Sequence, residues 1–162
     1  MITPNEARIV TNKNLDKAIA RAIIEEERKE EKLREQDIIN TARNYLTDIL
    51  SKTIGEKIAS HAADGYNTID ISCGDRGYVS IPWKSDLFIN SREFVGIYKK
   101  YMEHLNNGKF ITDNECWYVY DYTLFIQKII TKILVNNDYN FTEYRVEGNN
   151  NYSNRIDFVI TW

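Results

Sequence analysis

The side chains most often used in catalysis and metal binding are few and widely separated in this chain. Its only histidines are His61 and His104, and its only cysteines are Cys73 and Cys116. Neither histidine has another His or Cys three or four residues away, the spacing that places two metal ligands on one face of a helix. Neither cysteine lies in a Gly-rich elbow or at a helix start, the settings that favour a reactive thiolate. We therefore expect no catalytic set, no metal and no cofactor, and two buried thiols in a reducing compartment.

Acidic residues offer a second kind of chemistry, because a pair of carboxylates can act as acid and base. Asp70 and Asp157 fall on the polar faces of two predicted strands, and Arg155 shares the face of Asp157. Together they could form a site on the sheet. A polar sheet face exposed to solvent is the simpler interpretation, since alternation of polar and apolar residues produces such a face by itself.

The run Gly74-Asp75-Arg76-Gly77 could bind an anion, because two glycines let backbone amides converge and Arg76 adds a fork of donors. The run lacks the following helix start and the spacing of a nucleotide-binding loop. A hairpin turn is therefore the favoured interpretation, and Arg76 stays a candidate contact.

Aromatic residues are the most suggestive feature of the composition, with eleven tyrosines and three tryptophans. They concentrate in the run Trp117-Tyr118-Val119-Tyr120-Asp121-Tyr122. Tyrosine supplies rigid contact area with a polar tip, which suits interfaces and stacking pockets. A general bias toward Tyr, Asn, Ile and Lys is the alternative explanation. The candidate ligand- or partner-binding residues are Arg76, Trp117, Tyr118, Tyr120 and Tyr122.

The elements that would position these residues begin with a charged N-terminal helix. Thr3-Pro4 is a favourable helix start, Asn12-Lys13-Asn14 is a candidate break, and residues 25–32 are polar on every side. From Ile38 an apolar stripe returns, and Asp64-Gly65 is predicted to end the helix. The stripe consists of Ile38, Ala42, Tyr45, Leu46, Ile49, Leu50, Ile54 and Ile58. We assign residues 1–36 to a helical arm and residues 37–162 to a compact domain. Exposed apolar residues of the arm, such as Ile19 and Ile23, would be covered by homo-oligomerisation.

The remaining chain is predicted to form both helices and strands. Strands are predicted at Asn67–Cys73, Tyr78–Trp83, Tyr139–Glu147 and Asn154–Trp162, and helices at Ser91–Leu105 and Thr123–Val135. The last strand alternates Ile156, Phe158, Ile160 and Trp162 on one face, which should be buried. The helices should pack on this face, and the other predicted core residues are Ile126, Ile129, Ile130 and Ile133 together with Phe141 or Tyr144. The predicted fold is α+β, with a long N-terminal helix and two further helices on a four- to five-stranded antiparallel sheet that ends in a C-terminal β-hairpin around residues 148–151.

Charge and hydropathy exclude some function classes. A net charge of −3 and a pI near 5.5 lack the clustered basic excess of proteins that bind duplex nucleic acid. No apolar run reaches the ~18–20 residues that span a bilayer. We expect neither duplex nucleic acid nor a membrane as a partner.

Short motifs at both ends resemble a set of small bacteriophage proteins. Met1-Ile2-Thr3 and Glu6-Ala7-Arg8 open the charged helix, and Asp138-Tyr139 and Ile160-Thr161-Trp162 mark the closing helix end and hairpin. The resemblance covers roughly the first 72 and the last 40 residues; the middle, about Gly74–Asp121, is additional. It implies a phage origin and an α+β fold, and it transfers no catalytic residue.

These observations favour a non-catalytic bacteriophage protein that binds and blocks or sequesters a host or defence factor. The factor would be a protein or a small nucleotide-like ligand in the host cytoplasm. The alternative is a structural component of the virion that uses its N-terminal helix for assembly. An enzyme of unrecognised type is a third hypothesis.

Overall fold

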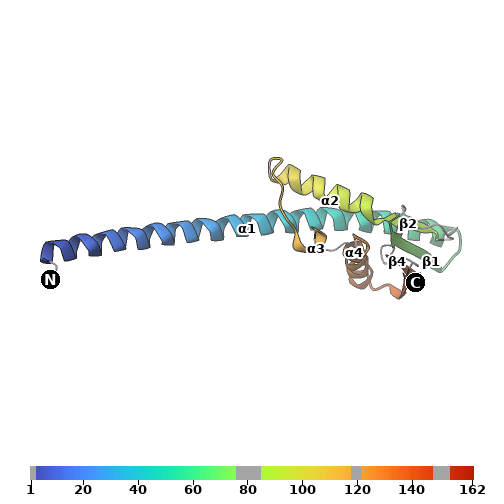
Figure 1. Cartoon of the computed structure of the whole chain (residues 1–162). Coiled ribbons are helices and arrows are strands. Elements are labelled where there is room, and N and C mark those ends of the chain that lie inside the picture. The colour runs from blue at the N-terminus through green and yellow to red at the C-terminus, as the bar shows by residue number, and fades with distance from the viewer. Residues whose placement is uncertain (1–2, 76–84, 118–121, 148–153) are drawn as a thin grey trace. The chain divides into compact units, whose positions relative to one another are not determined.

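The computed structural model describes residues 3–75, 85–117, 122–147 and 154–162, and it has the predicted α+β fold with a long N-terminal helix (Figure 1). The elements, in chain order, are α1 (Pro4–Ala63), β1 (Thr68–Gly74), β2 (Leu87–Asn90), α2 (Ser91–Leu105), α3 (Asn114–Trp117), α4 (Tyr122–Asn136), β3 (Asn140–Glu147) and β4 (Asn154–Thr161). The chain divides into two units, Met1–Ile38 and Ile39–Trp162. Helix α1 contributes residues to both units.

Helix α1 continues without interruption through Asn12-Lys13-Asn14, so the candidate break there is wrong. The helix propensity of asparagine is lower than that of alanine by less than about 1 kcal/mol, too little to end a long helix. The helix ends as predicted before Gly65, which has φ +87°. The amide of Tyr66 donates to the carbonyl of His61 at 3.0 Å, so a left-handed glycine satisfies the last turn.

The sheet has the strand order β2-β1-β4-β3 among the described residues. Strands β3 and β4 form the predicted C-terminal antiparallel pair, and β1 is antiparallel to β4. Strand β2 lies parallel to β1, so the prediction of a fully antiparallel sheet is wrong for this pair. The prediction placed the strand after β1 at Tyr78–Trp83, whereas the described neighbour of β1 is the later segment β2, which pairs from Ile71↔Leu87 to Gly74↔Asn90. The predicted strand Tyr78–Trp83 and the predicted hairpin turn at residues 148–151 lie outside the described residues.

The core lies on one face of this sheet. The register sets Ile69 opposite Ile160 and Ile71 opposite Phe158, so these side chains share a face, against which α2 and α4 pack. The predicted core residues that are buried are Ile126, Ile130, Ile133, Ile156, Phe158 and Ile160. Ile129 and Phe141 are half-buried and Tyr144 is exposed. The predicted burial of Trp162 is wrong: the residue follows the end of β4 and is 40% exposed.

Within the unit Ile39–Trp162, the remaining part of α1 buries one side and stacks Tyr45 on Tyr101 of α2. Its buried residues recur every three or four positions and are Ile39, Ala42, Leu46, Leu50, Ile54 and Ile58. This spacing defines one face of a helix, so the stripe predicted from Ile38 onward is confirmed at Ala42, Leu46, Leu50, Ile54 and Ile58. Of its other predicted members, Ile38 and Ile49 are half-buried and Tyr45 is 39% exposed.

Candidate functional site

Of the five residues predicted to contact a ligand or partner, only Tyr122 has a described side chain. Arg76, Tyr118 and Tyr120 lie outside the described residues, and Trp117 is placed in α3 without a described side chain. Tyr122 begins α4 and is half-buried. Its hydroxyl accepts a hydrogen bond from Lys99 Nζ at 3.2 Å, and the same ammonium lies 4.7 Å from the ring centroid. Tyr122 therefore joins α4 to α2, which is an internal contact.

The acidic sheet face differs from the solvated surface that the sequence favours. Arg155 is buried and donates to both carboxylate oxygens of Asp157, at 2.7 and 2.6 Å. The register places Asp157 opposite Ser72, which is also buried. The exposed Asp70 is on the same face, and its amide donates to the Asp86 carboxylate at 2.9 Å. Because a guanidinium neutralises Asp157, its carboxylate is not poised to act with that of Asp70 as an acid–base pair.

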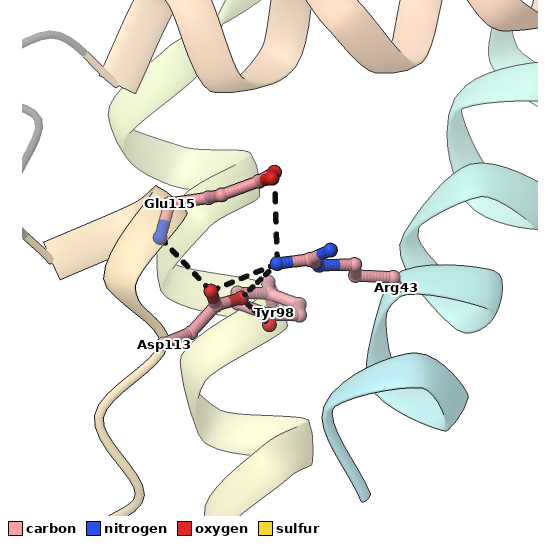
Figure 2. Close-up of polar contacts among 4 residues, drawn as sticks. All are labelled: Arg43, Tyr98, Asp113 and Glu115. Carbon is pink, nitrogen blue, oxygen red and sulfur yellow. Dashed lines mark hydrogen bonds and ion pairs between the residues drawn. The ribbon is translucent and has the colours of Figure 1, made fainter. Parts of the chain in front are cut away.

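A network of polar contacts within the unit Ile39–Trp162 is the Arg43 cluster, formed by Arg43, Tyr98, Asp113 and Glu115 (Figure 2). These residues come from α1, α2, the segment before α3, and α3. Arg43 Nη2 donates to both oxygens of Asp113, at 2.8 and 2.9 Å, and lies 3.6 Å from Glu115 Oε2. The Tyr98 hydroxyl donates to Asp113 Oδ2, and the Glu115 amide donates to Asp113 Oδ1 at 3.0 Å.

The electrostatics of the Arg43 cluster fix its protonation state. Burial raises the pKa of Tyr98, and its hydrogen bond to the Asp113 carboxylate raises it further. Burial acts to lower the pKa of Arg43, but Asp113 outweighs it and the pKa is raised overall. Tyr98 therefore stays a protonated donor and Arg43 stays charged at neutral pH. Neither group is poised to exchange a proton, as a general acid or base must be.

Cys116 lies near this cluster and is fully buried. Burial raises the pKa of its thiol to about 11; nearby Lys99 opposes this shift and Asp113 adds to it. At neutral pH the group is a thiol, whereas a nucleophile or metal ligand needs the thiolate. Cys73 is buried in β1, and the two cysteines form no disulfide.

His61 and Asp86 form a pair that the sequence does not reveal. His61 Nε2 lies 3.3 Å from Asp86 Oδ1, and the rings of His61 and Tyr66 have centroids 5.5 Å apart. Nδ1 of His61 is buried and has no hydrogen-bond partner among the described residues. An Asp–His pair can orient an imidazole, but nucleophilic catalysis also needs a hydroxyl or thiol beside it. The contacts described for His61 are to a carboxylate and a phenol ring.

A different kind of site lies in the unit Met1–Ile38. Seven large apolar side chains of α1 are 50–68% exposed there. They are Ile9, Val10, Leu15, Ile19, Ile23, Ile24 and Leu33. Leu15, Ile19 and Ile23 are four residues apart, and Leu33 follows Leu15 by 18 residues, or about five helical turns. These four residues, which we call the Leu15 face, therefore lie along one side of the helix.

Comparison with known proteins adds no relative: no protein-family model, curated protein or solved structure matches this chain. The described residues include no cluster of three or more His, Cys, Asp or Glu side chains suited to a metal ion. No helix within the described ranges is long and apolar enough to cross a membrane. Function is therefore inferred from the Arg43 cluster and the Leu15 face.

Proposed function

We propose that this chain is a non-catalytic binding protein that holds a protein partner against the Leu15 face of α1. The exposure of that face carries the proposal: Leu15, Ile19, Ile23 and Leu33 are 51–68% exposed. A helix of a globular protein normally buries such a row against its own core. A row spaced four residues apart is also the pattern by which a helix anchors itself in an apolar groove of another protein.

The chemistry of the unit Ile39–Trp162 supports binding over catalysis. Tyr98 and Cys116, the buried groups with the most altered pKa values, are both held in their protonated forms. Asp113 accepts hydrogen bonds from Arg43, Tyr98 and the Glu115 amide. Both oxygens of its carboxylate are therefore occupied by contacts within the protein. These contacts connect α1, α2 and α3, so the Arg43 cluster stabilises the packing of these helices within this unit.

The setting we propose is an infected bacterial cell. The resemblance of the chain ends to small bacteriophage proteins supports a phage origin, and the partner is then a host or defence protein that the chain blocks or sequesters in the host cytoplasm. A small nucleotide-like ligand is the other partner class, with Arg76 and the aromatic residues of 117–122 as its predicted contacts. The exposed apolar helix favours the protein partner, because a groove on another protein can cover it.

A structural role in the virion is the second candidate, and the same exposed helix favours it, since assembly also buries helix faces between subunits. The two roles differ in where the protein is found after infection. Quantitative mass spectrometry of purified particles separates them: a virion component is present in fixed stoichiometry, and an intracellular inhibitor is absent.

Affinity capture with matched variants tests the proposal. Ile19→Glu with Ile23→Glu places two charges in the Leu15 face, whereas Asn14→Glu adds a charge to the same segment outside it. The unsubstituted chain and Asn14→Glu are expected to retain the same protein from an infected-cell extract, and the double variant is expected to lose it. Equal retention by all three proteins would show that the Leu15 face is not the binding surface.

A further inference from the structure

We propose that two copies of this chain pair through α1 in antiparallel orientation, about a twofold axis at Ile24. The surface involved is the Ile24 face, formed by Val10, Lys17, Ile24, Glu31 and Ile38, which recur every seven residues. Seven residues make about two turns of helix, so these positions lie along one side. The pairing extends the proposed function. It rests on that proposal in one respect only, namely that α1 is a binding element.

Leu15 and Leu33 of the Leu15 face lie on the side of the helix opposite Ile24, whereas Ile19 and Ile23 lie about 140° and about 100° around the helix from it. Ile24 is nine residues from both Leu15 and Leu33, and at about 100° per residue nine residues amount to half a turn beyond two full turns. Val10 and Ile24 are 55% and 50% exposed, and Ile38 is half-buried. A second copy on the Ile24 face therefore leaves the Leu15 face open to the partner.

The charge of this part of α1 is divided between two halves. Residues 8–21 hold four basic residues and one acidic residue, a net charge of +3. Residues 25–37 hold seven acidic and four basic residues, a net charge of −3. In a parallel pair each half would meet a half of the same sign. In an antiparallel pair the basic half of one copy lies against the acidic half of the other, and this charge complementarity identifies a second copy as the occupant.

The individual charged positions are also complementary about a twofold axis at Ile24. Reflection of the sequence about Ile24 pairs Lys13 with Glu35, Lys17 with Glu31, and Arg21 with Glu27. The remaining reflected pair with a charge on both sides is Asp16 with Lys32, which is again of opposite sign. No two like charges are paired between positions 10 and 38.

The apolar positions are symmetric about the same point. Val10 reflects onto Ile38, and Ile24 meets its own copy on the axis. A twofold axis repeats each contact, so Val10–Ile38 and the three Lys/Arg–Glu pairs beside Ile24 occur twice in the dimer. Each exposed ion pair contributes little and is screened by salt, so the association should depend strongly on ionic strength.

Sedimentation equilibrium with charge-reversal variants tests the pairing. One variant carries Lys13→Glu, Lys17→Glu and Arg21→Glu, and the other carries Glu27→Lys, Glu31→Lys and Glu35→Lys. The natural chain should be a dimer at about 50 mM salt, where charges are screened less than at physiological ionic strength, and each variant alone should dissociate at least about tenfold more readily. A one-to-one mixture of the two variants should restore the dimer. Circular dichroism checks that each variant keeps its helices.

Single cysteines test the orientation. In an antiparallel pair Val10→Cys does not cross-link to itself under mild oxidation, but it does cross-link to Ile38→Cys when the two proteins are mixed. A self-linked Val10→Cys dimer, beyond the background of the natural chain, would overturn the antiparallel arrangement. A monomeric natural chain at low salt would overturn the pairing altogether.

The outcomes separate this inference from the proposed function. Ile19→Glu alone places its charge opposite Lys29 of the second copy, so it should leave the dimer intact while partner capture is weakened. A monomer that still captures the partner through Ile19 refutes the pairing and leaves the proposed function standing. A dimer that captures no partner refutes the proposed function and leaves the pairing standing.

Discussion

Asp113 is the carboxylate on which the Arg43 cluster converges, and its replacement is the sharpest test at the scale of single residues. Asp113→Asn keeps the size of the side chain but leaves the Arg43 guanidinium, whose side chain is 29% exposed, without its nearest charge partner. Breaking such a pair should lower the free energy of unfolding by about 2 to 4 kcal/mol, measured by urea denaturation. Glu115→Gln is the control, because Glu115 is 53% exposed and 3.6 Å away, and it should cost less than about 1 kcal/mol. Equal losses in the two variants would contradict the role of Asp113.

Protonation of buried groups predicts a loss of stability in alkaline solution. The pKa of Cys116 is raised from 9.0 to about 11, and the pKa of Tyr98 is raised from 10.0, so the folded chain holds more protons than the unfolded chain above about pH 9. Stability is therefore fully present below pH 9 and falls as the pH rises, by at most about 1.4 kcal/mol per pH unit for each group.

Thermal unfolding followed from pH 7 to 11 measures this dependence. The natural chain should begin to lose stability near pH 9, where unfolded Cys116 ionises. In Cys116→Ser the loss of stability should begin only at about pH 10, where Tyr98 ionises in the unfolded chain. An onset that does not move in the variant would show that the thiol contributes nothing to the alkaline transition.

The partners of Arg43 could not be predicted, because Asp113 is 70 residues away and no local pattern links the two. One signal was present in the sequence. Arg43 lies four residues after Ile39 and three before Leu46, within the apolar stripe of its helix. A charged residue at such a position requires a counterion nearby, although the sequence does not say which one. The candidate contacts Arg76, Tyr118 and Tyr120 remain predictions, since the structure does not describe them.

At the scale of helices and strands, the sequence predicted those elements whose position follows from the spacing of nearby residues. The helix Thr123–Val135 and the strand Asn154–Trp162 were expected within one residue of α4 and β4, because periodic burial and the flanking Asn residues mark their ends. Strand β2 was missed: it has four residues and leads directly into α2, so it shows too little alternation. Its parallel pairing with β1 depends on the course of the connection, which short-range patterns do not contain.

Two glycines, one inside α1 and one just beyond its end, should respond in opposite ways to the same substitution. Gly65 follows α1 with φ +87°, where a side chain is strained, so Gly65→Ala should destabilise the chain by about 1 to 2 kcal/mol. Gly55 lies within α1, and nothing lies within 4 Å of the position that an added methyl group would take. Gly55→Ala should therefore stabilise the chain by about 0.5 to 1 kcal/mol. Urea denaturation measures both, and changes of the same sign would contradict the left-handed helix end at Gly65.

At the scale of the whole molecule, the two units differ in how they treat their apolar residues, and we propose that they have different tasks. The unit Ile39–Trp162 buries the apolar faces of its helices and sheet, and the Asp113 carboxylate is bonded within the Arg43 cluster. The unit Met1–Ile38 leaves its apolar residues exposed on a charged helix. The assignment of an arm, residues 1–36, and a compact domain, residues 37–162, remains a prediction about how these tasks are divided.

Photo-cross-linking from position 19 in infected cells tests the central claim most directly. A photoreactive residue replaces Ile19 on the Leu15 face, and the matched control carries it at Asn14. We predict a discrete covalent adduct between the chain and one other protein from position 19 and its absence from position 14. No adduct from position 19, or the same set of adducts from both positions, would contradict the account.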